Sequence, residues 1–260
     1  MTTATAPRST WENFTGRALG VMRVDQRANH WTRFFTYDVI RREFGRRHFH
    51  WFDVGVVGMV DYERLVDQLS FTFTGVDLSA SIIEDGRKYL RHLDDRLLQW
   101  NIEDPPATAG LISGGFDLVT ARHILNHCHY YEQPLDHIQQ LLTEGGLAIL
   151  TLHLYLRDTE DRLRSNTRWT VPGEVIGNHY NKEKFLRALH ARFRIERFIR
   201  FDDGVKPNDM LIVRKRHAGE PAGEVPSMEI RRPPLTLRRI AGRLLPAPVK
   251  VCLKRLLGMS

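Results

Sequence analysis

Apolar and polar positions alternate in a regular way through the middle of the chain. Five largely apolar stretches have the length of a strand: 48–55, 71–78, 96–102, 116–125 and 145–154. Three segments between them repeat apolar residues at helical spacing: 62–69, 79–93 and 132–142. Ser79 is placed to cap the second helix, and Pro134 lies in the first turn of the third. This repetition predicts an α/β fold with a doubly wound, mainly parallel sheet.

The segments on either side of this repeat have different patterns. Residues 1–45 carry apolar positions at roughly helical spacing after a short polar start, which predicts an N-terminal helical cover. Residues 157–180 are polar and irregular, and we expect a helix and a lid there. A helix at 181–191 then precedes two strands at 193–203 and 209–216. The two strands are expected to close a seven-stranded sheet as an antiparallel pair.

The C-terminal part of the chain is basic and differs in composition from the rest. Residues 217–234 are rich in Pro and Gly and predict a linker that follows a main domain at 46–216. Residues 235–260 form a basic amphipathic tail, which suits a membrane surface or an acidic partner. The alternative is a helix folded back onto the domain. Nucleic acid is not expected as a partner, because the tail has no aromatic side chains to stack on bases.

Composition narrows the class of protein. The chain has 260 residues, 42% of them hydrophobic, which is enough for one substantial core. The formal net charge is +7, but the segment 231–255 alone contains eight Lys and Arg and no acid, so the body is close to neutral. Two distant cysteines argue against a disulfide framework. Without an apolar leader or a long apolar run, we expect a cytoplasmic protein, membrane-associated only through the tail.

Polar residues and glycines stand where the predicted strands end. Asp53 and Gly55 end the first strand, Asp77 the second, Asn101 the third, and Arg122 lies near the end of the fourth. In a doubly wound sheet, ligands bind at these carboxyl ends. An acid after the second strand can accept both hydroxyl hydrogens of a ribose, and an Asn after the third can pair with an adenine edge. Neither a Gly-x-Gly-x-x-Gly fingerprint nor a phosphate loop is present, which argues against NAD and nucleoside triphosphates.

Four stretches resemble the motifs of the class I S-adenosylmethionine-dependent methyltransferases. They are "FDVGVVG", "FTGVDLSASIIEDGRKY", "LLQWNIEDPP" and "FDLVTARHILNHCHYYEQPLDHIQQLLTEGGLAILTL", and the match as a whole covers about residues 49–154. The resemblance implies a Rossmann-like methyltransferase fold, S-adenosylmethionine as cofactor and a small-molecule acceptor, most simply the oxygen of a sugar, glycan or secondary metabolite. It places the cofactor against eight residues: Asp53, Gly55, Gly58, Asp77, Leu78, Asn101, Ile102 and Arg122.

The first motif departs from the family pattern at two positions. Val57 and Met59 stand where the family has its second and third glycines. A β-branched side chain rarely adopts φ > 0, so Val57 would obstruct the loop unless Gly58 shifts the turn by one residue. The alternative function is therefore a non-catalytic methyltransferase-fold protein that acts through its basic tail.

Methylation of a hydroxyl needs a base, and histidine is the usual one. His127 follows the fourth strand and His153 ends the fifth, so both are predicted to face the acceptor, as base or aligning group. Each has an ordinary packing role as its alternative. Arg122 has a second reading, as the group that holds an acidic substrate. No metal site is expected, because His48/His50 and His127/His129 lack a third ligand at a recognisable spacing. The sequence leaves the acceptor and the oligomeric state open.

Overall fold

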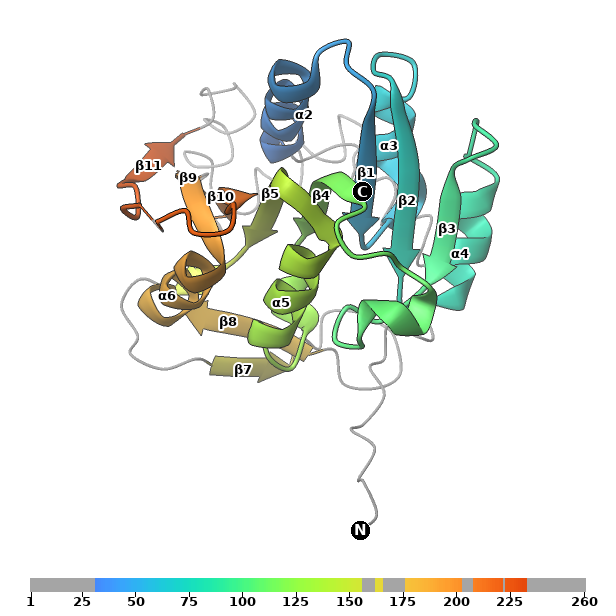
Figure 1. The fold of residues 1–260 in the computed structure, drawn as a ribbon. Helices are drawn as coiled ribbons and strands as arrows, with labels where there is room; N and C mark the ends of the chain where they lie inside the picture. The colour runs from blue at the N-terminus through green and yellow to red at the C-terminus, as the bar shows by residue number, and fades with distance from the viewer. Residues whose placement is uncertain (1–30, 156–161, 166–175, 203–207, 222, 233–260) are drawn as a thin grey trace, which may run out of the picture.

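The computed structural model describes residues 31–155, 162–165, 176–202, 208–221 and 223–232. Its centre is an eight-stranded sheet in the order β11-β9-β10-β5-β4-β1-β2-β3 (Figure 1). The bounds of the strands are β1 Phe49–Val54, β2 Phe71–Asp77, β3 Arg96–Gln99, β4 Phe116–Arg122, β5 Leu142–Leu152, β9 Phe193–Phe201, β10 Asn208–Lys215 and β11 Met228–Arg231. The predicted doubly wound, mainly parallel α/β fold is confirmed.

Strand pairing follows the predicted pattern in the first part of the sheet. β1 pairs in parallel with both β2 and β4, and β4 pairs in parallel with β5. β10 runs antiparallel to both β5 and β9, which confirms the antiparallel closing pair. The chain crosses over after β3 to reach β4 on the far side of β1, and this reversal opens a crevice at the carboxyl ends of the central strands.

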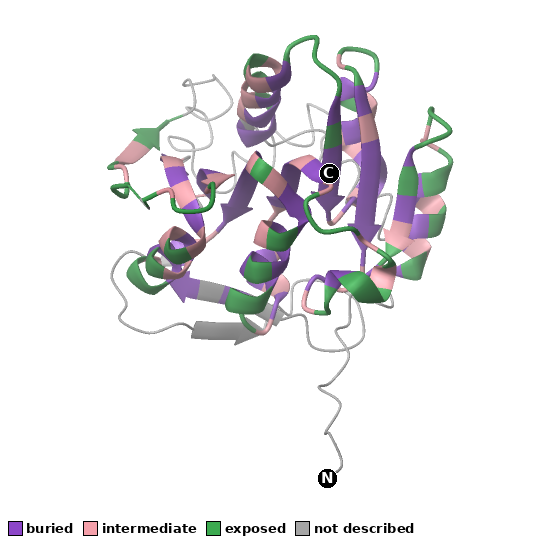
Figure 2. Ribbon diagram, viewed as in Figure 1, coloured by how far each residue is buried: buried purple, intermediate pink, exposed green. Residues whose placement is uncertain are grey.

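Both faces of the sheet are covered by helices, and Figure 2 shows the buried strands between them. One face packs against α2 (Trp31–Phe44), α3 (Val60–Leu65) and α4 (Ala80–Arg87). The other packs against α5 (Glu132–Leu141) and α6 (Lys182–Arg192). Side chains of β1 alternate between them, because Trp51 belongs to the first cluster while Phe52 and Val54 belong to the second. Their burial on both sides explains the apolar runs of the sequence.

Helix α2 is fixed to the sheet by a charged cluster that the hydrophobic pattern does not show. The Arg214 guanidinium on β10 donates 3.0 Å hydrogen bonds to both carboxylate oxygens of Glu43 on α2, and a 2.7 Å bond to Glu196 on β9. The cation therefore bridges three elements. Helix α2 lies within the predicted N-terminal cover, of which residues 1–30 lie outside the described part of the chain.

Two regions differ from the prediction. The described parts of the lid segment are strands: β7 (Arg162–Ser165) and β8 (Ile176–Asn181) form a small sheet with β6 (Leu154–Tyr155). No helix is seen in them, and the rest of 157–180 lies outside the described residues. Within the stretch 217–234, predicted as a linker, β11 pairs in parallel with β9, which makes the sheet eight-stranded instead of seven-stranded. The sequence did not predict this short strand, because the proline and glycine residues around it are typical of a linker.

The basic tail at 235–260 lies outside the described residues, so its partner stays a prediction. No helix within the described ranges has the length and apolar character needed to cross a membrane.

Candidate functional site

The first predicted motif forms a tight turn between β1 and α3. Gly55 donates a 2.8 Å backbone hydrogen bond to Val76 and has φ +83°, a conformation that favours glycine. A Cβ built at Gly55 would lie 2.2 Å from Cδ1 of Ile124, the residue that follows β4 and His123. The loop therefore passes close to the end of β4, and a side chain at this position would push the two apart.

The turn is completed by Gly58 and Met59, not by Val57. Gly58 has φ +71° and Met59 has φ +51°, whereas Val57 is not among the described residues with positive φ. Gly58 instead of Val57 thus takes the positive φ next to Met59, so Val57 needs no left-handed conformation; binding of the cofactor by this turn stays a prediction. Met59 carries the conformational strain of the turn, because the left-handed region is unfavourable for a residue other than glycine. Its buried side chain, 2% exposed, packs near Gly86 of α4 and compensates for this conformation.

Asp77 ends β2 in a buried position beside this turn. Its Oδ1 accepts the backbone N–H of Ser79 at 3.0 Å, and the Ser79 hydroxyl accepts from Ile82 N at the start of α4, as the predicted cap. Burial raises the pKa of Asp77 to about 7, although backbone hydrogen bonds from Ser79 and Leu78 oppose the shift. The carboxyl group is thus held by main-chain donors at the point where the sequence predicts a ribose.

The residues after β3 make more hydrogen bonds within the protein than the sequence suggests. Oδ1 of Asn101 accepts the backbone N–H of Glu103 at 3.1 Å, so this oxygen closes a local turn. Ile102 is buried, and its carbonyl oxygen accepts a 2.7 Å hydrogen bond from Nδ1 of His137 on α5. Glu103 in turn accepts from the backbone and ring of His129. The adenine contact of Asn101 stays a prediction, for which the amide nitrogen and the second lone pair of Oδ1 are available.

Asp53 lies just before the turn, and its side chain is linked by hydrogen bonds to Thr120 and, through Thr120, to Trp51. The Thr120 hydroxyl on β4 donates a 2.5 Å bond to Oδ1 of Asp53 and accepts a 2.7 Å bond from the Trp51 indole nitrogen. Burial and the nearby Asp61 carboxylate raise the pKa of Asp53 to about 7, against the opposing effects of Thr120 and two arginines.

A cluster of charged side chains surrounds Asp61, at the start of α3. Oδ1 of Asp61 lies 2.6 Å from Nη1 of Arg33 and 2.5 Å from the Tyr37 hydroxyl, both on α2. Its Oδ2 lies 2.9 Å from Nη2 of Arg122 at the end of β4. Burial alone would raise the pKa of Asp61, but Arg122 and Arg33 hold it below the usual range. The same carboxylate and burial raise the pKa of Tyr37.

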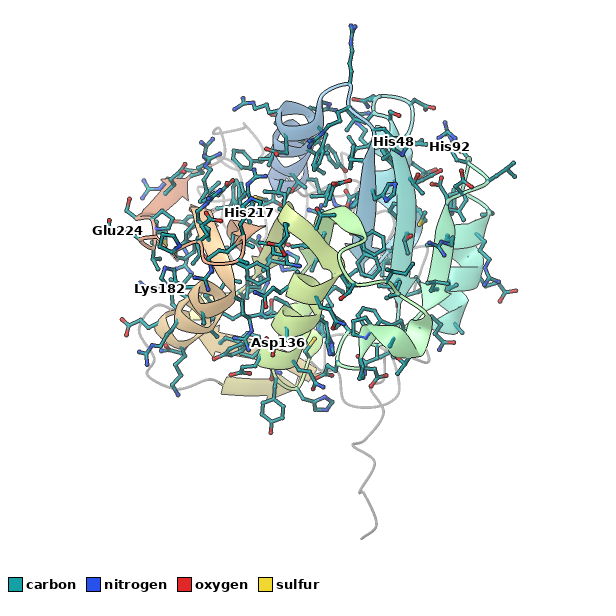
Figure 3. The ribbon with its side chains drawn as sticks, viewed as in Figure 1. His48, His92, Asp136, Lys182, His217 and Glu224 are labelled. Carbon is teal, nitrogen blue, oxygen red and sulfur yellow. The ribbon has the colours of Figure 1, made fainter. Side chains whose placement is uncertain are left out.

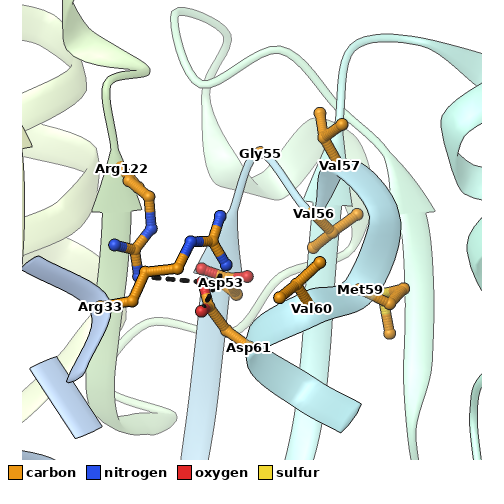
Figure 4. Close-up of a pocket in the computed structure, with 9 residues that line it drawn as sticks. All are labelled: Arg33, Asp53, Gly55, Val56, Val57, Met59, Val60, Asp61 and Arg122. Atoms are coloured by element: carbon orange, nitrogen blue, oxygen red, sulfur yellow. Dashed lines mark hydrogen bonds and ion pairs between the residues drawn. The ribbon is translucent and has the colours of Figure 1, made fainter. Parts of the chain in front are cut away.

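Figure 4 shows that the turn and this cluster line one pocket. Its lining residues are Arg33, Asp53, Gly55, Val56, Val57, Met59, Val60, Asp61 and Arg122. Three of the predicted cofactor residues therefore meet here: Asp53, Gly55 and Arg122. The other lining residues, above all Arg33 and Asp61, were not predicted as site residues.

Arg122 has unused hydrogen-bonding capacity in this pocket. Its Nη2 atom is bound to Asp61, but Nε and Nη1 are buried and have no hydrogen-bond partner within the described residues. Buried donors of this kind are costly unless something accepts from them. The pocket thus combines buried guanidinium N–H groups and a buried carboxyl group, which are complementary to the two charges of an α-amino acid. The methionine end of S-adenosylmethionine carries both charges, so these residues fit the cofactor that the sequence implies.

The predicted catalytic histidines lie on neighbouring loops at the same edge of the sheet. His127 ends the short 3-10 helix η4 (Leu125–His127), and His153 follows β5. The His153 ring stacks on His123 with centroids 4.8 Å apart and planes 26° apart. His123 was not predicted, yet it has φ +56°, a conformation rare outside glycine and often found at functional sites. A left-handed residue carries no signal in the sequence that could have identified it.

The remaining histidines are placed differently. His48, His92 and His217, labelled in Figure 3, lie at the periphery of the molecule. The ring nitrogens of His48 lie 3.0 Å and 3.1 Å from the hydroxyls of Ser70 and Thr72, so each nitrogen has a hydrogen-bond partner. The described ranges contain no group of three or more His, Cys, Asp or Glu side chains arranged to hold a metal ion.

Strand β8 of the lid segment is tied to the loop that carries His127. The Asn126 amide donates to Asn178 O at 2.5 Å, while its Oδ1 accepts the backbone N–H of His153 at 3.0 Å. The Tyr180 hydroxyl lies 2.6 Å from Leu125 O and 3.0 Å from Cys128 O. The lid segment therefore fixes the geometry of both histidine-bearing loops.

Comparison with known proteins agrees with this geometry. A family model described as "Methyltransferase domain" matches residues 61–148. The chain is 29% identical over 110 residues, 42% of its length, to the polyketide synthase-nonribosomal peptide synthetase phmA of Phaeosphaeria nodorum. It spans only 3% of the length of that relative.

Solved structures show the same fold at low sequence identity. An S-adenosylmethionine-dependent methyltransferase from Mesorhizobium loti is 14% identical with a TM-score of 0.55, over 69% of this chain and 97% of that one. The 1,6-didemethyltoxoflavin-N1-methyltransferase of Burkholderia thailandensis, solved with 1,6-didemethyltoxoflavin and S-adenosylhomocysteine, is 16% identical with a TM-score of 0.54. That match covers 82% of this chain and 94% of the other.

Proposed function

We propose that the chain is a class I S-adenosylmethionine-dependent methyltransferase, that it uses S-adenosylmethionine as its cofactor, and that it methylates an oxygen of a small molecule. The methyltransferase-domain match over residues 61–148 and the fold shared with solved methyltransferases support this proposal. The observation that carries this proposal is the intact turn from Gly55 to Met59 between two buried carboxyl groups, Asp53 and Asp77. Met59 keeps a left-handed conformation in this turn, and non-glycine residues in that conformation cluster at functional sites.

We expect each cofactor residue to contact the part of the cofactor that its side chain suits. Asp77 accepts the ribose hydroxyls, Leu78 and Ile102 line the nucleoside, and Asn101 meets the adenine. When bound, the cofactor supplies an electrophilic methyl group on a sulfonium. The protein's own contribution is to hold this group in line with an acceptor and to exclude water.

A neutral hydroxyl is a weak nucleophile, so a base is needed on the acceptor side. His127 and His153 lie on adjoining loops that Asn126 and strand β8 hold in place, and either imidazole can take the hydroxyl proton. The imidazole's part would be to take up the hydroxyl proton; the methyl group would come from the sulfonium, whose sulfur would leave as a neutral thioether with the electron pair of the broken S–C bond.

Support for a secondary metabolite as acceptor comes from the curated relatives. A polyketide synthase-nonribosomal peptide synthetase and the polyketide synthase component of compactin nonaketide synthase, from Penicillium citrinum, match over 42% and 30% of this chain. Because those matches span a small part of each relative, we use them only to favour polyketide-like hydroxyl compounds over sugars and glycans in the choice of test acceptors.

The proposal is tested with cofactor that carries a deuterated methyl group. The protein is incubated with panels of hydroxylated polyketides, phenols, sugars and glycans, and with matched amines, and products are identified by mass spectrometry and NMR. We expect label on oxygen, lost in His127→Ala or His153→Ala while cofactor affinity is kept. Label only on nitrogen or carbon would contradict oxygen as the acceptor atom, and no transfer to any compound would argue against the proposed acceptor class.

A further inference from the structure

We propose that the buried ion pair of Arg200 and Asp209 positions His153, and that it acts through the backbone of Leu154. The part that His153 plays in methyl transfer rests on the proposed function, whereas the contacts that hold its backbone do not. Arg200 lies on β9 and Asp209 on β10, which pairs with β5. Both side chains bind the segment that follows the end of β5.

Leu154 is held at both of its main-chain polar groups. Its N–H donates to Oδ2 of Asp209 at 2.9 Å, and its carbonyl oxygen accepts from Nη2 of Arg200 at 2.9 Å. The two side chains are joined to each other by two bonds of 2.7 Å, from Nε and Nη2 of Arg200 to the two carboxylate oxygens of Asp209. The planar guanidinium and the carboxylate therefore form one rigid unit that binds a single residue on two sides.

His153 lies between two peptide groups that are both fixed by side chains. The peptide before it is held at the His153 N–H, which donates to Oδ1 of Asn126 at 3.0 Å. The peptide after it is held at the Leu154 N–H, which donates to Asp209. Because peptide groups are planar, their orientations set φ and ψ of His153 and thus the direction of its Cα–Cβ bond. Asn126 and Asp209 together determine where the imidazole leaves the backbone.

The central sheet does not supply these contacts, because β5 ends just before His153. The last registered partners of β5 are Arg122 for Thr151 and Asp209 for Leu152. The chain then enters β6, which pairs with β8 of the lid segment. Where a chain passes from one sheet to another, its N–H groups need acceptors outside the strand ladder. The carboxylate at the start of β10 is such an acceptor.

The chemical nature of the pair favours positioning over stability as its role. Asp209 is 0% exposed and Arg200 is 7% exposed. Taking two charges out of water costs free energy that their attraction returns only in part, so well-packed apolar side chains often stabilise such a site as well or better. Apolar side chains cannot bind the N–H and the carbonyl oxygen of Leu154. The contribution that requires an ion pair here is therefore the backbone geometry beside His153.

The ring of His153 is where this geometry has its effect. It stacks on His123 with centroids 4.8 Å apart, and the His123 N–H donates to the carbonyl oxygen of Thr151 at 2.7 Å. A change in the direction of the His153 Cα–Cβ bond would separate the two rings and displace the imidazole nitrogens. A displacement of about 1 Å can cost a reacting group about a hundredfold in rate.

The test replaces the ion pair without leaving an unpaired buried charge. In the double variant Arg200→Met/Asp209→Leu, apolar side chains fill the space, and we expect the midpoint of urea unfolding to stay close to that of the native protein. The contacts to Leu154 are lost. NMR of the ligand-free full chain with isotope-labelled histidine reports the rings, assigned with His153→Gln and His123→Gln. We expect His153 to lose the chemical shifts that the stacked pair gives it.

Kinetics give a second readout. With an acceptor found in the labelled-methyl experiment, kcat of the double variant should fall about 10- to 100-fold, while the affinity for S-adenosylmethionine stays within about threefold. Arg200→Lys keeps the charge but not the planar fork that reaches both Asp209 and Leu154, so we expect an intermediate loss of about 3- to 10-fold. The control, Arg197→Gln/Glu229→Gln, removes a partly exposed pair and should leave the ring signals and kcat unchanged.

The other outcomes are distinguishable. Native His153 signals and native kcat in a stable double variant would overturn the proposal, and so would a less stable double variant that keeps those signals. If the double variant does not fold, Arg200→Lys decides, because native His153 signals in that variant would equally overturn the proposal. A native protein that binds no S-adenosylmethionine would contradict the proposed function, while the NMR comparison without ligand would still decide whether the ion pair holds His153.

Discussion

The Thr120 hydroxyl donates a 2.5 Å hydrogen bond to Oδ1 of Asp53, and a third side chain supports it. An indole N–H can only donate, so the hydroxyl accepts from Trp51 through one of its two lone pairs and keeps its own proton for the carboxylate. This bond stabilises the ionised form of Asp53, against the effect of burial, which favours the protonated form.

This arrangement predicts that cofactor binding is linked to proton release. The pKa values of Asp53 and Asp77 are both raised to about 7 in the ligand-free protein. An ammonium group and a pair of ribose hydroxyls both bind the ionised forms better, so binding must lower these pKa values. Affinity should therefore rise as pH increases from about 6 to 7.5 and level off above it. Calorimetry in buffers of different ionisation enthalpy measures the protons released, which we expect to approach two at pH 6.

Matched variants separate the two contributions. Asp53→Asn and Asp77→Asn should each reduce the number of protons released by about one, because each removes one titrating group. The other charged groups that face Asp53 are Asp61, Arg33 and Arg122; the pKa of Asp61 is lowered and that of Arg33 is raised, so neither of these two titrates in this range. Affinity that is independent of pH between 6 and 7.5 would contradict the account.

The shifted turn makes opposite predictions for two neighbouring residues. Val57→Gly should leave cofactor affinity within about threefold, because Val57 does not occupy a conformation that requires glycine. Gly58→Ala puts a side chain on a residue with φ +71°. It should lower the free energy of unfolding by about 1 kcal/mol and weaken cofactor binding. Thermal unfolding and calorimetry on both variants measure this. A large gain in affinity from Val57→Gly would show that the turn is built differently.

A buried ion pair beside the lid segment should matter for stability. Arg200 donates 2.7 Å bonds to both oxygens of Asp209, which is fully buried and also accepts from Leu154 N at 2.9 Å. Asp209→Asn leaves a buried guanidinium without its charge partner, and we expect a loss of about 3 kcal/mol in urea unfolding. Glu229→Gln, which breaks the partly exposed pair with Arg197, is the control and should cost less than 1 kcal/mol. Equal losses in both variants would contradict this.

The sequence predicted the central sheet well because strands buried on both faces leave apolar runs that stand out. Asp53, Gly55, Asp77 and Asn101 were placed correctly at strand ends, since the end of each run marks the edge where parallel strands meet. These predictions use only local pattern, which extends over a single strand and turn.

The rest depended on contacts between distant parts of the chain. Asp61 binds side chains 28, 24 and 61 positions away in sequence, and no spacing rule relates them. The turn at Gly58 depends on which residue takes positive φ, a choice that packing of Met59 against α4 decides. The short edge strand β11 has four residues in a Pro/Gly-rich stretch, too few to show a period.

The central claim, that this fold binds S-adenosylmethionine between the Gly55 turn and Asp77, is tested most directly by calorimetry with that cofactor. We predict saturable binding to the native protein and a loss of at least about tenfold in affinity for Asp77→Ala, because two hydroxyl–carboxylate bonds are removed. Asp94→Ala, at an exposed position, should bind like the native protein. No heat from the native protein, or equal affinity in Asp77→Ala, would contradict the account.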